Sequence, residues 1–125
     1  MIGYVTIGVN DLARAEAFYT ELLSEVGGKL LFGNERIKFF TGAGDGGMLA
    51  ICIPYDEQAQ NCGNGNMVAI SANDSDHIKA LYDKALSLGA TDEGEPGERV
   101  PGMFEGAYVR DLDGNKLCFY KMNLG

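Results

Sequence analysis

The stretch YVTIGVNDLARAEAFYTELL, residues 4–23, has a counterpart in MVAISANDSDHIKALYDKAL, residues 67–86. A shift of 63 positions brings identical residues together, and these are Val5 and Val68, Ile7 and Ile70, Asn10 and Asn73, Asp11 and Asp74, Ala17 and Ala80, Tyr19 and Tyr82, and Leu23 and Leu86. An internal repeat of this kind indicates a duplicated structural unit. We therefore predict that the chain contains two copies of one module.

Each copy has the pattern of a strand followed by a helix. The β-branched run at residues 4–9 leads into Asn10-Asp11, whose side-chain oxygens can cap a helix, and Asn73-Asp74-Ser75 does the same in the second copy. Glycines then supply a permissive stop, Gly27-Gly28 first and Gly89 second. The residues predicted to face a sheet are Leu12, Ala15, Phe18, Tyr19, Leu22, Leu23 and Val26 in the first helix, and Ile78, Leu81, Tyr82, Ala85 and Leu86 in the second.

Two hairpin signals extend the repeat beyond the helices. At a shift of 68 positions Asp45-Gly46 falls on Asp113-Gly114, and an Asp-Gly pair between strand-like runs is typical of a tight turn. The flanking runs are residues 37–41 and 107–110. Further strands are expected near Leu30 and Thr91.

Each module thus reads as strand, helix and three strands, which predicts an α+β fold of two tandem βαβββ modules. The first module spans residues 1–53, a polar and glycine-rich linker spans 54–66, and the second module spans 67–125. A second loop is expected at residues 94–102, which contain Pro96 and Pro101. The 125 residues, 46% of them apolar, suit a single domain.

Composition limits the partners of the chain. Its net charge is −8 and its ten Lys and Arg form no stripe, so we expect no nucleic-acid binding. No apolar run is long enough to span a membrane, and the first residues lack a signal-peptide pattern, so a cytoplasmic protein with no membrane partner is expected. The three cysteines, an odd number without CxxC spacing, are predicted to be reduced thiols.

The strand, Asn-Asp and helix opening at residues 4–12, the aromatic pair Phe18-Tyr19, and RDLDGN at residues 110–115 resemble the glyoxalase/bleomycin-resistance/dioxygenase superfamily, also called vicinal oxygen chelate proteins. The resemblance covers nearly the whole chain. It implies a glyoxalase-like fold, in which each module curls its strands into half of a cup-shaped mixed β-sheet with the helices outside. In that family the cavity between the halves typically holds a divalent metal ion.

The resemblance places the usual metal ligands, commonly His and Glu, at Tyr4, Ala50, Met67 and Cys118 of this chain. A hard or borderline cation prefers imidazole and carboxylate, which none of these side chains offers. No metal or other cofactor is therefore expected, although a divalent metal held by other groups stays open. The only histidine, His77, is predicted to lie on the solvated face of the second helix and not to bind metal.

The candidate ligand-binding residues are Tyr4, Met67, Tyr108, Cys118, Tyr120, Arg36 and Arg110. The tyrosines can donate hydrogen bonds to a guest or fill space, and Cys118 can line the cavity or be a small buried hydrophobe. The arginines can grip a carboxylate, or Arg110 can form a salt bridge within its hairpin. Phe104 and Glu105 can form a rim or an exposed turn.

The first functional hypothesis is a protein that binds a small organic molecule in the cavity, with catalysis left open. Bleomycin-resistance proteins resemble it in sequestering a drug without metal, and an acidic chain favours a cationic guest. The alternatives are a lyase or isomerase similar to lactoylglutathione lyase, and a non-catalytic interaction module. A homodimer is expected because strand edges need cover, with the modules paired within one chain or swapped between two.

Overall fold

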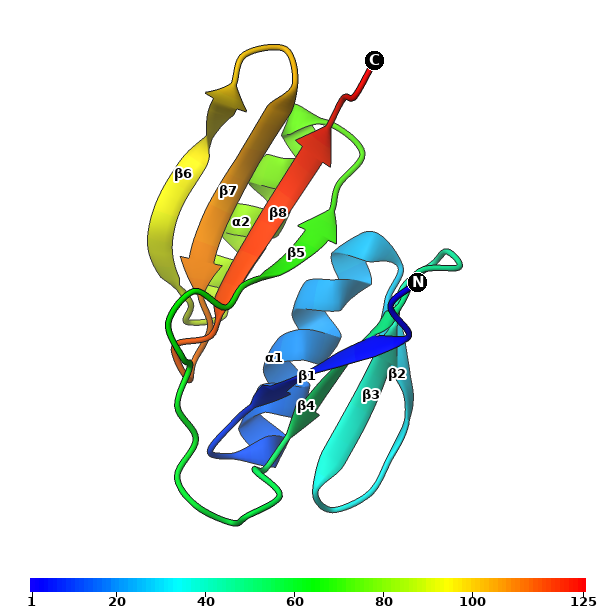
Figure 1. Ribbon diagram of the computed structural model, residues 1–125, viewed down its shortest axis with the longest axis vertical. Helices are drawn as coiled ribbons and strands as arrows, with labels where there is room; N and C mark the ends of the chain where they lie inside the picture. Colours follow the sequence, from blue (N-terminus) through cyan, green and yellow to red (C-terminus); the bar gives the residue numbers. More distant parts are fainter. The chain divides into compact units, whose positions relative to one another are not determined.

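The structure, a computed structural model, describes all residues from Met1 to Gly125 (Figure 1). The chain forms two compact units, Met1–Cys62 and Gly63–Gly125, so the division falls within the expected linker. Each unit contains one four-stranded sheet and one long helix, which confirms the α+β fold of two βαβββ modules. The two sheets are separate, and each keeps two edge strands.

The first unit runs strand, helix and three strands. A short 3-10 turn, η1, extends the helix, and Gly27 follows it with φ 68°, a left-handed conformation that glycine adopts without strain. The elements are β1 (Tyr4–Gly8), α1 (Leu12–Leu23), η1 (Ser24–Val26), β2 (Lys29–Gly33), β3 (Ile37–Thr41) and β4 (Met48–Cys52).

The second unit repeats this order. Its elements are β5 (Val68–Ser71), α2 (Ser75–Ser87), β6 (Thr91–Val100), β7 (Phe104–Arg110) and β8 (Lys116–Met122). The strand orders are β1-β4-β3-β2 in the first sheet and β5-β8-β7-β6 in the second. The pairing is equivalent too, because β1 lies parallel to β4 with Thr6 opposite Ala50, and β5 lies parallel to β8 with Ala69 opposite Cys118. The repeat in sequence is therefore also a repeat in strand register.

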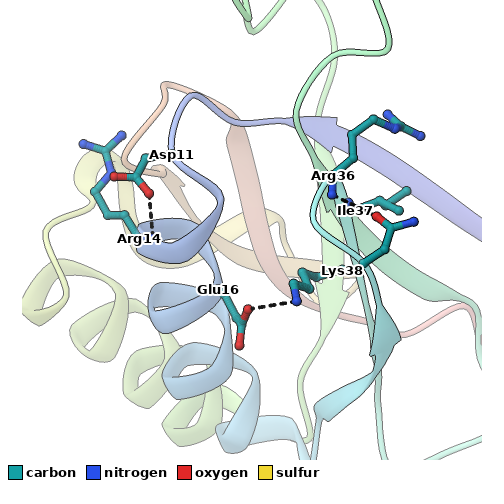
Figure 2. Close-up of polar contacts among 7 residues, drawn as sticks. Asp11, Arg14, Glu16, Arg36, Ile37 and Lys38 are labelled. Atoms are coloured by element: carbon teal, nitrogen blue, oxygen red, sulfur yellow. Dashed lines mark hydrogen bonds and ion pairs between the residues drawn. The ribbon is translucent and has the colours of Figure 1, made fainter. Parts of the chain in front are cut away.

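Both predicted helix caps are confirmed. The Asp11 carboxylate accepts the backbone N–H of Arg14 at 3.0 Å (Figure 2), and the Asp74 carboxylate accepts that of His77 at 2.8 Å. His77, however, is half-buried, and its Nδ1 accepts the backbone N–H of Asn73 at 3.0 Å. The imidazole therefore helps to order the start of α2.

Each helix covers one face of its own sheet (Figure 1). In the first unit the ring of Tyr19 packs 6.4 Å from that of Phe40, and Glu16 pairs with Lys38 at 3.7 Å (Figure 2). In the second unit the Tyr82 hydroxyl donates to Asp92 at 2.9 Å. The buried residues of the helices are Ala15, Phe18, Tyr19, Leu22 and Leu23 in α1, and Ile78, Leu81, Tyr82 and Ala85 in α2. These are the faces that the apolar spacing predicts.

The prediction of a loop at residues 94–102 is wrong for residues 94–100, because β6 runs from Thr91 to Val100, and only Pro101 and Gly102 lie in a turn. Proline is tolerated here because β6 is an edge strand, and Pro96, which has no backbone N–H, is not paired with β7. The register of β6 against β7 shifts between Gly94 and Gly97, around this residue. The alternative of an exposed turn at Phe104 and Glu105 is also wrong. They begin β7, and the Glu105 carboxylate accepts the hydroxyl of Ser75 at 2.7 Å.

Side chains alternate across each strand, so every sheet also has a face that no helix of its own unit covers. We call these the first open face, on β1–β4, and the second open face, on β5–β8. Phe40 and Lys38 point toward α1, so Phe39 lies on the first open face. Asp92 accepts a hydrogen bond from Tyr82 of α2, so Asp92 and its strand partner Val109 face the helix. The neighbouring residue Tyr108 therefore lies on the second open face.

Neither helix is long and apolar enough to cross a membrane.

Candidate functional site

The first open face carries a cluster of three aromatic rings. Phe39 lies at its centre, with Phe32 stacked on it at 4.5 Å and Tyr4 edge-on at 5.1 Å between ring centroids. Tyr4 and Phe32 are each 54% exposed. Because large apolar rings are rarely left half in water on a strand surface without a partner, this cluster is a candidate contact surface.

The second open face also carries aromatic rings. Tyr108 on β7 is directly opposite Cys118 on β8, and Gly106 is opposite Tyr120. The rings of Phe104 and Tyr120 lie parallel with their centroids 5.7 Å apart. Three predicted site residues, Tyr108, Cys118 and Tyr120, are therefore brought together on one face.

The Cys118 thiol is fully buried at the centre of this face. Burial raises the pKa of Cys118, and it also raises the pKa of Tyr108, with which the thiol shares a hydrogen bond. The thiol is therefore protonated at neutral pH, whereas a nucleophilic cysteine needs a lowered pKa. This environment favours the interpretation of Cys118 as a small buried group.

Two cations flank the Tyr108 ring. The guanidinium carbon of Arg99, on β6, and the ammonium nitrogen of Lys116, on β8, each lie 5.3 Å from its centroid. The Arg99 guanidinium also donates to the backbone oxygen of Glu95 at 2.6 Å, which fixes its direction along β6. The second open face therefore combines aromatic surface with positive charge.

Of the remaining predicted residues, Arg110 also lies on the second open face, opposite Lys116, whereas Arg36 and Met67 lie elsewhere. Arg36 donates to the Ile53 oxygen at 3.0 Å and lies over the Tyr55 ring, so it holds the start of the linker. Arg110 donates to the Gly114 oxygen at 3.1 Å and pairs with Glu93 at 3.2 Å, so its fork is used within its own sheet and hairpin. Met67 directly precedes β5 and is exposed.

Several residues of the two open faces were not among the predicted site residues. Phe32 and Phe39 sit on strands whose facing direction follows from the sheet register, and Lys116 shares a strand face with Cys118 at a spacing of two. That spacing is a signal readable in the sequence. Arg99 lies in the segment taken for a loop, so only the structure brings it to Tyr108.

The four positions that the family resemblance assigns to metal ligands fit a metal ion poorly. Ala50 and Cys118 are fully buried, and the alanine has no donor atom. Tyr4 lies against Phe39, and Met67 offers a thioether. No group of three or more His, Cys, Asp or Glu side chains is close enough together to hold a metal ion. This donor set does not suit a hard or borderline cation.

Comparisons with known proteins give a consistent result. The family model described as Glyoxalase/Bleomycin resistance protein/Dioxygenase superfamily matches residues 1–119. A solved glyoxalase/bleomycin resistance protein from Albidiferax ferrireducens T118 is 31% identical, with a TM-score of 0.87, covering 96% of this chain and 97% of that chain. Comparison with curated proteins finds no significant match.

Two further solved structures are similar at lower identity. A glyoxalase/bleomycin resistance protein/dioxygenase family enzyme from Burkholderia phytofirmans PsJN has a TM-score of 0.78 at 15% identity, covering 97% of this chain and 98% of that chain. A lactoylglutathione lyase from Agrobacterium tumefaciens has a TM-score of 0.71 at 21% identity, covering 96% and 92%. At these identities the likeness concerns the fold alone.

Proposed function

We propose that this chain, which belongs to the glyoxalase/bleomycin resistance protein/dioxygenase superfamily, binds a small organic molecule through the open faces of its sheets, without a metal ion. The observation that carries the proposal is the set of half-exposed aromatic rings on these faces. Apolar surface with a few polar tips is the usual composition of a small-molecule site. The Tyr4, Tyr108 and Tyr120 hydroxyls supply such tips.

The proposal of a metal-free site rests on the poor metal ligands at the four family positions, which are Tyr4, Ala50, Met67 and Cys118. Elemental analysis of the purified and dialysed protein is expected to find well under one transition-metal ion per chain. One Zn, Ni, Mn or Fe retained per chain would contradict this. It would instead favour the second candidate, a lyase or isomerase; the Agrobacterium tumefaciens protein is named a lactoylglutathione lyase.

We also propose that the protein is a cytoplasmic homodimer. Each sheet has two edge strands, and on β2 the side chains of Leu30, Leu31 and Phe32 are exposed. Such edges are commonly covered by association. No disulfide joins the three cysteines, as is usual in a reducing compartment. Light scattering at micromolar concentration should give about twice the chain mass, and a concentration-independent monomer would contradict the dimer.

Binding at the open faces is tested by a thermal-shift screen of metabolites and drugs, because a ligand bound only by the folded state raises the melting temperature. Thr6 and Ala69 are repeat-equivalent, exposed, and opposite the buried Ala50 and Cys118. Thr6→Trp and Ala69→Trp place a large ring on the first and second open face, respectively. Each variant should abolish the shift of ligands bound at its own face.

The matched control is Ala80→Trp, which adds the same ring to an exposed position of α2. It should leave every shift unchanged. Ligands that stabilise the parent and both open-face variants equally would place the site elsewhere and overturn the proposal. A complete absence of ligands, together with a stable complex with another protein, would favour the third candidate, a non-catalytic interaction module.

A further inference from the structure

The two cations beside Tyr108 stand out in a chain with 18 acidic and ten basic side chains. Neither Arg99 nor Lys116 forms an ion pair with a carboxylate. By contrast Arg110, on the same sheet, pairs with Glu93. An acidic protein thus has two cations without a carboxylate partner together on one face, beside the same aromatic ring.

The shape of β6 holds the Arg99 side chain in this place. A Cβ atom built on Gly94 would lie 3.2 Å from one terminal guanidinium nitrogen, and one built on Gly97 would lie 3.1 Å from the other. The Gly94 position would also crowd the Tyr108 ring, at 2.9 Å. The absence of side chains at these two glycines therefore leaves the space in which the guanidinium lies beside Tyr108.

The electrostatics of the face agree with this geometry. Arg99 lowers the pKa of Tyr108, and both Arg99 and Lys116 lower the pKa of Cys118, in each case against a larger raising effect of burial. Both cations therefore favour negative charge at the centre of the second open face. No cation lies over the rings of Tyr4, Phe39 or Phe32, so the first open face lacks this property.

We infer that Arg99 and Lys116 bind the carboxylate of a small organic acid whose planar, apolar body lies against Phe104 and Tyr120. The inference rests on the proposed function and names the chemical class of its ligand. A guanidinium fork matches the two oxygens of a carboxylate, and the ammonium adds a second positive charge. The parallel rings of Phe104 and Tyr120 provide an apolar surface on the same strands. The local charge thus selects an anion, whereas the net charge of the chain favours a cation.

The test compares three probes that share one ring system: 2-naphthoate, 2-naphthamide and 2-naphthylmethylamine. Dissociation constants are measured by NMR titration of the full-length protein, up to about 5 mM ligand. The carboxylate is expected to bind at least about tenfold more tightly than the amide, and more tightly than the amine, because only it complements the two cations. Equal or tighter binding of the amide or the amine, or no binding of the carboxylate, would overturn the inference.

Variants locate the contact. Arg99→Gln and Lys116→Gln should each weaken naphthoate binding about 5- to 20-fold while changing amide binding less than about twofold. Gly97→Ala, which keeps the charge but crowds the guanidinium, should weaken it by a smaller factor. The control Lys79→Gln removes the same charge from α2, where Lys79 pairs with Asp83, and should have no effect. If Lys79→Gln weakened naphthoate binding equally, the loss of affinity would be due to net charge alone, and the inference would be overturned.

Failure of this inference is distinguishable from failure of the proposed function. If the amine or the amide binds best and Ala69→Trp abolishes that binding, the open-face site stands and the anion specificity is wrong. If naphthoate binds but Ala69→Trp, Arg99→Gln and Lys116→Gln leave its affinity unchanged, the second open face is not its site, and the inference is wrong.

Discussion

The first and second units have one topology and one register but different open faces. In both units a helix capped by Asp packs on a sheet whose first strand lies parallel to its last. The first open face carries Tyr4, Phe39 and Phe32 with no cation over the rings, whereas the second carries Tyr108 between Arg99 and Lys116. The face of each sheet that is covered by its helix, which we call the helix-facing layer, is therefore alike in the two units. The two copies differ on their open faces.

The largest loss of stability is expected when a buried ring of the helix-facing layer is removed. Phe40 and Phe119 are almost fully buried, so Phe40→Ala and Phe119→Ala should each lower the free energy of unfolding by about 3–5 kcal/mol. Phe39→Ala, on the first open face, should cost about 1–2 kcal/mol. Urea denaturation measures all three, and a Phe39 cost equal to that of Phe40 would remove the distinction between the faces.

The two Asp-Gly hairpins should respond very differently to loss of an aspartate. In the second unit the buried Asp111 carboxylate accepts the backbone N–H groups of Asp113 and Asn115, each at 2.9 Å, and the Asn115 amide at 3.1 Å. Asp111→Ala should therefore cost about 2–3 kcal/mol, because buried donors lose their acceptor. Asp45→Ala, in the exposed hairpin of the first unit, should change stability by less than about 0.5 kcal/mol. Thermal denaturation of both variants would show whether the two turns differ in this way.

The helix caps should behave alike in the two units. Asp11→Ala and Asp74→Ala each remove one carboxylate acceptor from the first turn of a helix, so each should cost about 1 kcal/mol. Asp11→Asn and Asp74→Asn should restore most of the stability, because the amide oxygen also caps. Chemical denaturation that found one cap several times more important than the other would contradict the equivalence of the modules.

The smallest expected change in stability comes from the ionisation of one tyrosine of the second unit at alkaline pH. Burial, with the hydrogen bond to Asp92, raises the pKa of Tyr82 to about 12 from its ordinary value of 10.0. The folded state therefore holds this proton more tightly, so its contribution to stability is complete below pH 10 and is lost as pH rises toward 12. Tyr82→Phe should flatten this decline in urea denaturation between pH 10 and 12. An unchanged slope in the variant would assign the decline to other groups.

The sequence predicts the repeat, the caps and the buried helix stripes because these depend on spacing along the chain. It predicts a strand near Thr91 but not the extension of β6 to Val100, because Pro96 and three nearby glycines suggest a loop unless the strand is known to be an edge. The candidate site is predicted in part: Tyr108, Cys118 and Tyr120 follow from alternation along two strands. The contact of Arg99 with Tyr108 depends on strand pairing and on irregular register, which no local pattern encodes.

All the strand pairs of the first sheet form within the first unit, the longest reaching from Tyr4 to Met48. On the ribosome, the second unit, Gly63–Gly125, is still to be made when these partners are complete. At about 5–20 residues per second its synthesis takes roughly 3–13 s, whereas mixed α/β domains fold within milliseconds to seconds. The first copy therefore has time to fold before the equivalent strands of the second copy are made, which limits mispairing between the repeats.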